Sequence, residues 1–375
     1  MGENRPILVV GGGYAGLSFI RQMRKYSPEI PVTLIDKNPY HTMLVETHQV
    51  AAGTRPAESV LIPFDQLGDF RFIRAEVLAV DPGTRTLSTT AGDIRYDRLV
   101  LAVGSVDHDY GVPGVREHCQ MLRGLADAEE IRRRLDALGP DAPVLIAGGG
   151  LTGVELAAHI ALRRPGHRSI TLVEAAPTLL PGLPPRLARA ARRRLGLLGV
   201  NVLAGSPVTR VEAGRAHLRD GTVLPFGLMI WAAGVRAHPL VTALGLPADR
   251  TGRVIVGPDY RTPLPDVYVI GDCASGHQPS AQAALQQGRA LAAVLTGRSP
   301  APLRSKGVLV DLGEHRAVGR VGAITLSGLV PGILKRFTEA AWIGRIGGWG
   351  AALRSLIWGS PALSEGVEGA PRMRI

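Results

Sequence analysis

The sequence predicts an α/β protein built from two Rossmann-like dinucleotide-binding domains, one of them inserted in the other. A glycine-rich turn between an apolar strand and a helix-like stretch occurs at residues 7–16 and again at 144–153. Each copy is followed by a β-branched run that ends in an acidic residue. The chain has 375 residues, which is long enough for more than one core. Two βαβ units are therefore expected.

In the first copy, the apolar run 7–10 leads into Gly11, Gly13 and Gly16. A dinucleotide fold needs glycine at these places for the tight turn, for approach of the backbone to the pyrophosphate, and for packing of the helix on its strand. The helix that opens here offers backbone N–H groups to the phosphates. Asp36 ends the next strand, at the spacing of an acid that bonds a ribose hydroxyl.

The second copy repeats this pattern with Gly148, Gly150 and Gly153, and Glu174 takes the place of the acid. Glu174 would accept bonds from a 2′-hydroxyl and repel a 2′-phosphate, which favours NADH over NADPH. The alternative interpretation is a strand-end acid that merely faces water.

A late apolar strand, residues 267–272, is predicted to return to the first domain, which makes the second domain an insertion. Residues 85–89 and the turn at Asp220 and Gly221 are predicted to form antiparallel hairpins. The expected boundaries are 1–112 and 241–302 for the first domain, 113–240 for the second, and 303–375 for a C-terminal interface or membrane-associating region.

Two dinucleotide sites in one chain predict FAD in the first domain, because useful hydride transfer needs a different redox group opposite the nicotinamide. At this point the sequence resembles the flavoprotein superfamily with two dinucleotide-binding domains, whose late Gly-Asp motif holds FAD. Gly271 and Asp272 match that motif. The alternative for Asp272 is an ordinary strand-terminating residue.

Within that superfamily the disulfide reductases carry a redox cysteine pair, and residues 40–53 contain no cysteine. The sequence is more similar to the type II NADH dehydrogenases, single-chain NADH:quinone oxidoreductases that sit on one membrane leaflet. The similarity extends over roughly residues 5–325 and is carried by the segments 149–157, 230–235 and 281–288.

This resemblance implies catalytic roles for three side chains. Glu155 would lie near the nicotinamide and flavin, and Gln282 and Gln286 would approach the quinone side of the ring. The two glutamines are four residues apart, so a helix would present both on one face. The alternatives are a first-turn acid that complements the helix dipole for Glu155, and a solvated helix face for the glutamines.

The residues expected to bind FAD and NADH are those of the two glycine turns, the neighbouring strand ends and the Gly-Asp motif. They are Gly11, Gly13, Tyr14, Ala15, Gly16, Asp36, Lys37, Val77, Ala102, Gly104, Gly148, Gly150, Leu151, Thr152, Gly153, Glu174, Gly234, Gly271, Asp272 and Gln282.

The stretch 42–48 departs from the family pattern, which leaves the electron acceptor open. The alternatives to a quinone acceptor are a specialised small molecule and a carrier protein. A further alternative is that the chain is a flavin-based redox sensor. His41 and His48 are candidate proton donors, although isolated loop histidines are more often merely exposed.

The composition narrows the partners. A net charge of +11 favours anionic ones, but the arginine runs 132–134 and 192–194 are predicted to be solvated helix faces, and no nucleic acid is expected. Cys119 and Cys273 form no Cys-x-x-Cys pair, so we expect structural thiols and no metal site.

The short polar lead 1–6 leaves no room for a secretory signal, so a cytoplasmic protein is expected. No apolar run after residue 301 reaches the roughly 20 residues that span a bilayer. The tryptophans and arginines of 329–358 predict an amphipathic segment on the inner face of the cell membrane; packing on the chain's own core or in a homodimer is the alternative. Gly344, Gly347, Gly348 and Gly350 are predicted to weaken a continuous helix there.

Overall fold

The computed structural model describes residues 5–68, 70–163 and 169–358, with the backbone alone at 347–351 and 353–358. The chain divides into two compact units. The first unit comprises the described residues of 1–42, 62–108 and 235–305, and the second comprises those of 43–61, 109–234 and 306–375. Residues 43–61 thus group with the second unit, whereas the sequence placed them in the 1–112 stretch.

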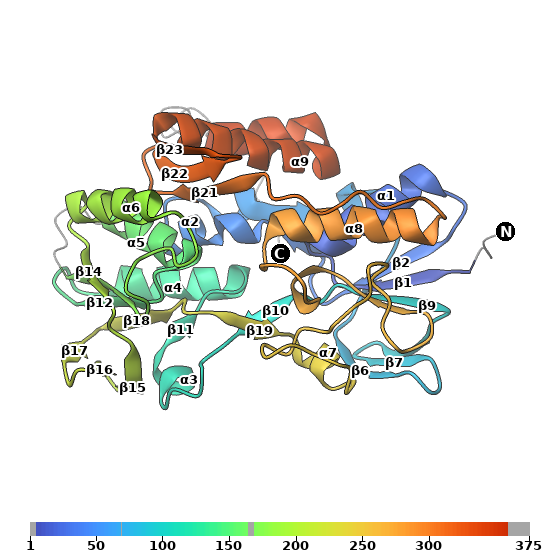
Figure 1. Ribbon diagram of the computed structural model, residues 1–375, viewed down its shortest axis with the longest axis horizontal. Coiled ribbons are helices and arrows are strands. Elements are labelled where there is room, and N and C mark those ends of the chain that lie inside the picture. The colour runs from blue at the N-terminus through green and yellow to red at the C-terminus, as the bar shows by residue number, and fades with distance from the viewer. Residues whose placement is uncertain (1–4, 69, 164–168, 359–375) are drawn as a thin grey trace. The chain divides into compact units, whose positions relative to one another are not determined.

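The first unit is built on a parallel sheet of five strands in the order β20-β9-β1-β2-β5. The predicted return of the late strand is confirmed, because Val267 and Val269 of β20 pair in parallel with β9. Helices α1 and α8 pack against each other (Figure 1). The bounds are β1 Ile7–Val10, β2 Val32–Asp36, β5 Arg71–Arg74, β9 Arg98–Leu101, β20 Val267–Val269, α1 Tyr14–Tyr26 and α8 Ala281–Leu295.

Smaller elements complete this unit. An antiparallel sheet of β6, β7 and β8 includes the hairpin predicted at 85–89, and β10 pairs with β19. Their bounds are β6 Val77–Asp81, β7 Thr86–Thr89, β8 Gly92–Arg95, β10 Ser105–Asp107 and β19 Val235–Ala237. The shorter elements are β3 Tyr40–Thr42, β4 Leu61–Pro63, α7 Pro239–Thr242, and the 3₁₀ turns η3 Phe64–Gln66 and η4 Gly271–Cys273.

The second unit repeats the parallel architecture in a sheet of order β11-β18-β12-β13-β14. Strand β12 pairs with β13 and β18 as β1 pairs with β2 and β9. The sheet strands are β11 Gln120–Met121, β12 Val144–Ala147, β13 Ile170–Glu174, β14 Asn201–Ala204 and β18 Leu228–Trp231. The helices are α3 Val115–His118, α4 Leu125–Ala137, α5 Leu151–Arg163 and α6 Pro185–Leu197, and the antiparallel strands are β15 Val208–Glu212, β16 Arg215–Leu218 and β17 Val223–Pro225.

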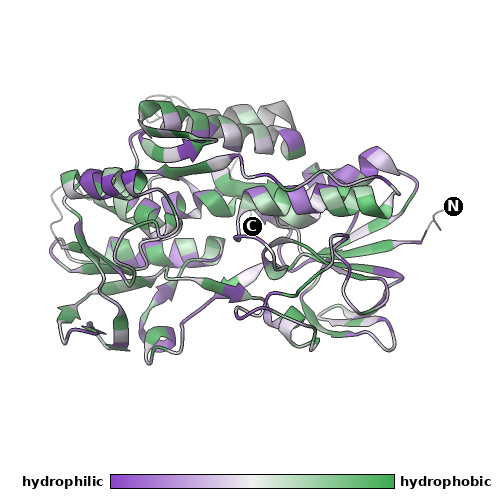
Figure 2. Cartoon of the chain, in the orientation of Figure 1, coloured by the Kyte–Doolittle hydropathy of each residue, from purple (hydrophilic) through white to green (hydrophobic). Residues whose placement is uncertain are grey.

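The arginine runs lie on helices of this unit. Arg192 and Arg193 are exposed on α6, which is largely hydrophilic in Figure 2. Arg133 and Arg134 of α4 are exposed and bond Glu130 of their own helix. The predicted solvated faces are confirmed for these four arginines, whereas the Arg194 side chain is 17% exposed and bonds Glu314 at 2.6 Å.

A C-terminal layer of this unit consists of a three-stranded antiparallel sheet and the helix α9, and the short helix α2 from the earlier stretch packs on α4 and α5. The prediction of an interrupted terminal helix is wrong, since α9 is continuous and packs on β21, β22 and β23 with Trp342 and Ile343 buried. No helix in the described part of the chain is long and apolar enough to cross a membrane. The bounds are β21 Gly307–Asp311, β22 Ala317–Val321, β23 Ile324–Gly328, α9 Leu329–Trp358, α2 Thr47–Ala52, η1 Leu44–Glu46 and η2 Ala57–Val60.

The two histidines near the altered stretch are buried, so the interpretation of exposed loop residues is wrong. His41 is 1% exposed and His48 is 2% exposed. In the first unit, His41 Nδ1 lies 3.0 Å from the carbonyl oxygen of Gly12, and its ring meets the edge of Tyr14. Burial lowers the pKa of His41 to about 4, which keeps the ring neutral and able to donate to that carbonyl.

We predict that His41 makes the protein less stable in acid. Unfolding returns the ring to its ordinary pKa of 6.5, so between pH 6.5 and pH 4 the unfolded chain binds a proton that the folded chain does not. The contribution of His41 to the free energy of unfolding is therefore fully present above pH 6.5, and about 3 kcal/mol of it is lost as the pH drops to 4. Urea unfolding of His41→Asn, which keeps a donor but cannot titrate, should show a shallower decline. His118→Asn, at an exposed histidine, should behave like the wild type.

Candidate functional site

The first glycine turn joins β1 to α1 through unusually close backbone contacts. Gly11 has a φ of +104°, and a Cβ there would lie 2.4 Å from the carbonyl oxygen of Ala102. A Cβ on Gly16 would lie 2.0 Å from the carbonyl oxygen of Gly11. No other residue fits at either position without moving backbone, which explains the first and third glycines of the pattern.

The second turn has the same construction. Gly148 has a φ of +109°, with a Cβ position 2.5 Å from the Ala232 carbonyl oxygen. A Cβ on Gly153 would lie 1.8 Å from the carbonyl oxygen of Gly148. The internal duplication seen in the sequence is therefore a duplication of backbone geometry.

The middle glycines face open space instead. A Cβ on Gly13 or on Gly150 would meet no atom within 4 Å, and each residue stands directly before the first turn of its helix, α1 or α5. An open helix N-terminus suits a phosphate because its N–H groups and dipole favour negative charge. The residues present thus fit one pyrophosphate at each turn, as FAD and NADH require.

The two strand-end acids hold these turns. Asp36 accepts N–H bonds from Gly12 at 2.7 Å and Asn38 at 2.8 Å. Glu174 accepts from Gly149 at 2.5 Å and Ala176 at 2.6 Å, and is only 9% exposed. The alternative interpretation of Glu174 as an acid that faces water is wrong. Burial raises the pKa of Asp36, and its backbone bonds oppose that rise.

The Gly-Asp motif lies in η4 of the first unit. Gly271 has a φ of +81°, and Asp272 accepts a bond of 3.3 Å from Ser105. The Gly271 N–H donates to Gln287 Oε1 at 2.7 Å, and Gln287 is 1% exposed. Sequence reasoning missed Gln287 because its neighbour Gln286 carried the family resemblance. The supporting amide belongs to the same helix, one residue further on.

The other predicted cofactor residues lie around these two turns or at strand ends within their own units. Tyr14 and Ala15 open α1, Leu151 and Thr152 open α5, and Val77 starts β6. Lys37 Nζ lies 3.7 Å from Glu76 Oε1. Ala102 and Gly104 follow β9. Gly234 leaves room for Tyr110, whose hydroxyl oxygen would lie 2.1 Å from an added Cβ. Their assignment to cofactors stays a prediction.

Glu155 is the most unusual of the predicted catalytic residues. It lies on α5 and is 7% exposed. Its Oε1 accepts hydrogen bonds from Lys335 Nζ at 2.6 Å and from the backbone N–H of Asp311 at 2.9 Å. Burial raises the pKa of Glu155, and the Lys335 ammonium opposes that rise. A simple helix-dipole role does not account for a buried ion pair. Sequence reasoning missed Lys335, which stands 180 positions further along the chain.

The two glutamines lie on α8, as the spacing predicts, but they differ in their contacts. The Gln286 amide donates to the Arg304 carbonyl at 3.0 Å and accepts the Arg304 N–H at 2.9 Å. It also donates to the Gln282 carbonyl at 3.2 Å. The Gln286 side chain therefore binds the backbone of Arg304, in the segment that follows α8.

The two cysteines are free and buried. Burial raises the pKa of each thiol to about 12, so neither supplies a thiolate at neutral pH. The expectation of structural thiols is confirmed, and dithiol chemistry has no support in these residues.

Comparison with known proteins agrees with this geometry. Residues 5–288 match the family described as pyridine nucleotide-disulphide oxidoreductase. A type II NADH:quinone oxidoreductase of Staphylococcus aureus is 30% identical over 94% of this chain and 98% of its own length. The NADH dehydrogenase-like protein YutJ of Bacillus subtilis is 28% identical over 88% of this chain and 96% of its own.

The fold is also that of a solved relative. NDH2 from Plasmodium falciparum, in a complex with NADH, superposes with a TM-score of 0.86 at 18% identity, covering 99% of this chain and all of that one. Fold class, oxidoreductase activity and the pair of nucleotide cofactors were predicted from the sequence and are confirmed. On the evidence of its two nucleotide turns and these matches, the chain belongs to the type II NADH:quinone oxidoreductase family.

Proposed function

We propose that this protein oxidises NADH through bound FAD and passes two electrons to a quinone. The observation that carries the proposal is the pair of open helix N-termini at Gly13 and Gly150, each beside a strand-end acid, in a chain of this family. When bound, FAD supplies a centre that takes up two electrons as a hydride and gives them up again. NADH, a quinone and one proton from solution yield NAD⁺ and the quinol, so the electrons and protons balance.

The protein's own contribution is to position the reactants and to hold protons. The turn at Gly148 to Gly153 would orient the nucleotide, and the close approach of reactants would supply most of the rate. Glu155 and Lys335 form a buried pair in which a proton can be held close to either group. We assign Glu155 the role of holding a proton and its compensating charge during turnover. Gln282 is assigned a contact with the acceptor.

Reduction and reoxidation of the flavin test the proposed function directly. The purified protein should carry a flavin chromophore that NADH bleaches within the mixing time and that a water-soluble quinone restores over many cycles. NADPH should react more slowly, because Glu174 would meet its 2′-phosphate with a like charge. Bleaching without reoxidation by any quinone would reject the quinone and leave a specialised acceptor, a carrier protein or a sensor.

Replacing Glu155 should slow turnover without loss of flavin. Glu155→Gln keeps the Oε1 acceptor but removes the negative charge that faces Lys335. We expect kcat with quinone to fall by about 100-fold, within the range of proton-transfer groups, at an unchanged ratio of FAD to protein. Glu212→Gln, at an acid of the β15–β16 hairpin in the same unit, serves as the matched control. An unaltered kcat in the Glu155 variant would remove this assignment.

We also propose that α9 attaches the protein to the inner face of a membrane. Four apolar residues of its N-terminal half are 49–67% exposed: Leu329, Val330, Ile333 and Phe337. Exposed apolar side chains together with a net charge of +11 suit an anionic lipid surface. The predicted contributions of Trp349 and Trp358 lie outside the described side chains. A second copy of the chain over the same residues is the alternative.

Vesicle binding separates these two surfaces. The protein should cosediment with vesicles containing phosphatidylglycerol, and the double variant Val330→Asp, Phe337→Asp should bind at least about 10-fold more weakly, because each buried apolar side chain contributes about 1.5–3 kcal/mol. Leu197→Asp, at an equally exposed position on α6, should leave binding intact. A dimer in sedimentation that the double variant dissociates, with no lipid binding in either protein, would assign the surface to a second copy.

A further inference from the structure

A cleft of about 640 Å³ opens in the second unit beside α5, β21 and α9. Charged and polar side chains from five separate stretches of the chain line it. They include Glu46, Thr54, His159, Asp311, Lys335 and Glu339. His159 and Asp311 lie at the wall of this cleft, and His48 of α2 stands beside them.

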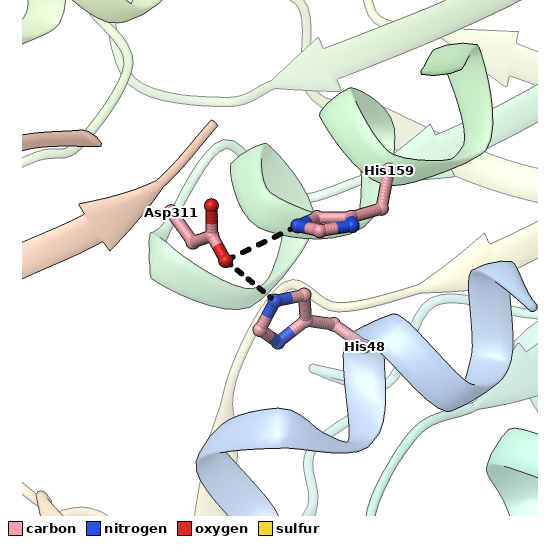
Figure 3. Close-up of side chains that lie close together, drawn as sticks. All are labelled: His48, His159 and Asp311. Atoms are coloured by element: carbon pink, nitrogen blue, oxygen red, sulfur yellow. Dashed lines mark ion pairs between the residues drawn. The ribbon is translucent and has the colours of Figure 1, made fainter. Parts of the chain in front are cut away.

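Three of these side chains point their polar atoms at one place. His159 Nε2 lies 3.2 Å from Asp311 Oδ2, and His48 Nε2 lies 4.0 Å from the same oxygen. Figure 3 shows both contacts meeting at that oxygen from α2, α5 and β21. The ligand atoms all lie within 4.8 Å of one another, and tetrahedral zinc holds its ligand atoms about 3.3 Å apart. Shifts of a fraction of an ångström would complete such a shell.

The other nitrogen of each ring is already directed toward an acceptor. Thr54 Oγ1 can donate its hydrogen to the Gln49 carbonyl at 3.2 Å and accept one from His159 Nδ1 at 2.9 Å. His48 Nδ1 faces Glu155 Oε2 at 3.7 Å. Histidine ligands of metals usually donate their second N–H to a carboxylate or another oxygen, which fixes the tautomer. In this tautomer both Nε2 atoms carry lone pairs.

Both Nε2 atoms are buried, since His48 and His159 are 2% and 7% exposed. His48 Nε2 has no hydrogen-bond partner among the described residues, and the near neighbour of His159 Nε2 is Asp311 Oδ2 at 3.2 Å. With its lone pair toward Asp311, His159 Nε2 at 3.2 Å would be repelled unless positive charge, a proton or a metal ion, lay between the two atoms. A cation at this point would satisfy all three groups.

The surrounding charges accommodate a cation. Lys335 Nζ is balanced by Glu155 at 2.6 Å and Glu339 at 3.7 Å. Burial, and then the charge of Glu46, raise the pKa of Glu339 well above its usual range, so this side chain is neutral. Without it the cluster holds three carboxylates, Glu46, Glu155 and Asp311, and three cations, Arg55, Lys335 and Arg336, so no excess of positive charge opposes a bound cation.

We propose that His48, His159 and Asp311 form a binding site for a divalent transition metal ion, with Zn²⁺ as its representative. Two imidazoles and one carboxylate suit zinc and its neighbours in the first transition row. The ion would enter from the cleft, and water from the cleft would take the remaining coordination position. Gln49 Nε2 donates to Asp311 Oδ2 at 3.2 Å and would hold the carboxylate in place. This site revises the expectation that the chain has no metal site.

The test uses tag-free, flavin-loaded protein stripped of metals and titrated with Co²⁺ and Zn²⁺. One Co²⁺ per chain should bind and give the visible ligand-field bands of nitrogen and oxygen ligation, and Zn²⁺ should displace it. His159→Gln should weaken Zn²⁺ binding by more than about 100-fold, because loss of a supporting residue already costs about 10- to 100-fold. Thr54→Val, which removes the supporting bond to His159 and the bond to the Gln49 carbonyl at an exposed residue, should weaken it by about 10-fold.

The matched control is His217→Gln. His217 is a histidine of the same unit that pairs with one carboxylate, Glu212, at 3.0 Å. It should bind Zn²⁺ like the wild type, and all variants should keep their flavin and circular dichroism. The proposal falls if wild-type protein gives no Co²⁺ bands, or if Thr54→Val and His159→Gln bind as tightly as the control. Should His159→Gln fail to fold, Thr54→Val and the wild-type spectrum still decide the question.

Discussion

Both nucleotide sites depend on backbone atoms that approach each other more closely than any side chain would permit. At Gly11 and Gly148 the chain leaves a strand in a left-handed conformation and passes against the carbonyl of a neighbouring strand. The third glycine of each turn lies over the first. These contacts direct the helix N-terminus toward open space at Gly13 and Gly150, and that open, positive end is what a pyrophosphate needs.

The strand-end acids connect this geometry to cofactor choice. Asp36 and Glu174 each accept two backbone N–H bonds, so each carboxylate stabilises its turn as well as standing where a ribose is expected. His41 adds a further buried bond to Gly12 in the first unit. The turns are therefore fixed in the absence of ligand, which reduces the entropy that nucleotide binding has to overcome.

The second unit buries an ionic network that contributes little to stability by itself. Taking charges such as Glu155 and Lys335 out of water is costly, and their attraction only offsets that cost when the geometry is good. The pair of Glu155 and Lys335 would serve proton balance during turnover. The neighbouring group of His48, His159 and Asp311 would bind the proposed cation. The helices α2 and α5 and the strand β21 hold the two groups in one framework.

The sequence by itself determined the paired βαβ units, the glycine turns with their acids and the return of β20, because each is a local pattern of apolar spacing, φ requirement and strand length. Tertiary structure decided the rest. The burial of His41 and His48, the pairing of Glu155 with Lys335 and the meeting of His48, His159 and Asp311 join residues far apart in the chain, and no local pattern encodes such contacts. The glycines of α9 at positions 344, 347, 348 and 350 are likewise poor helix formers, and the packing of the helix on β21, β22 and β23 overrides that propensity.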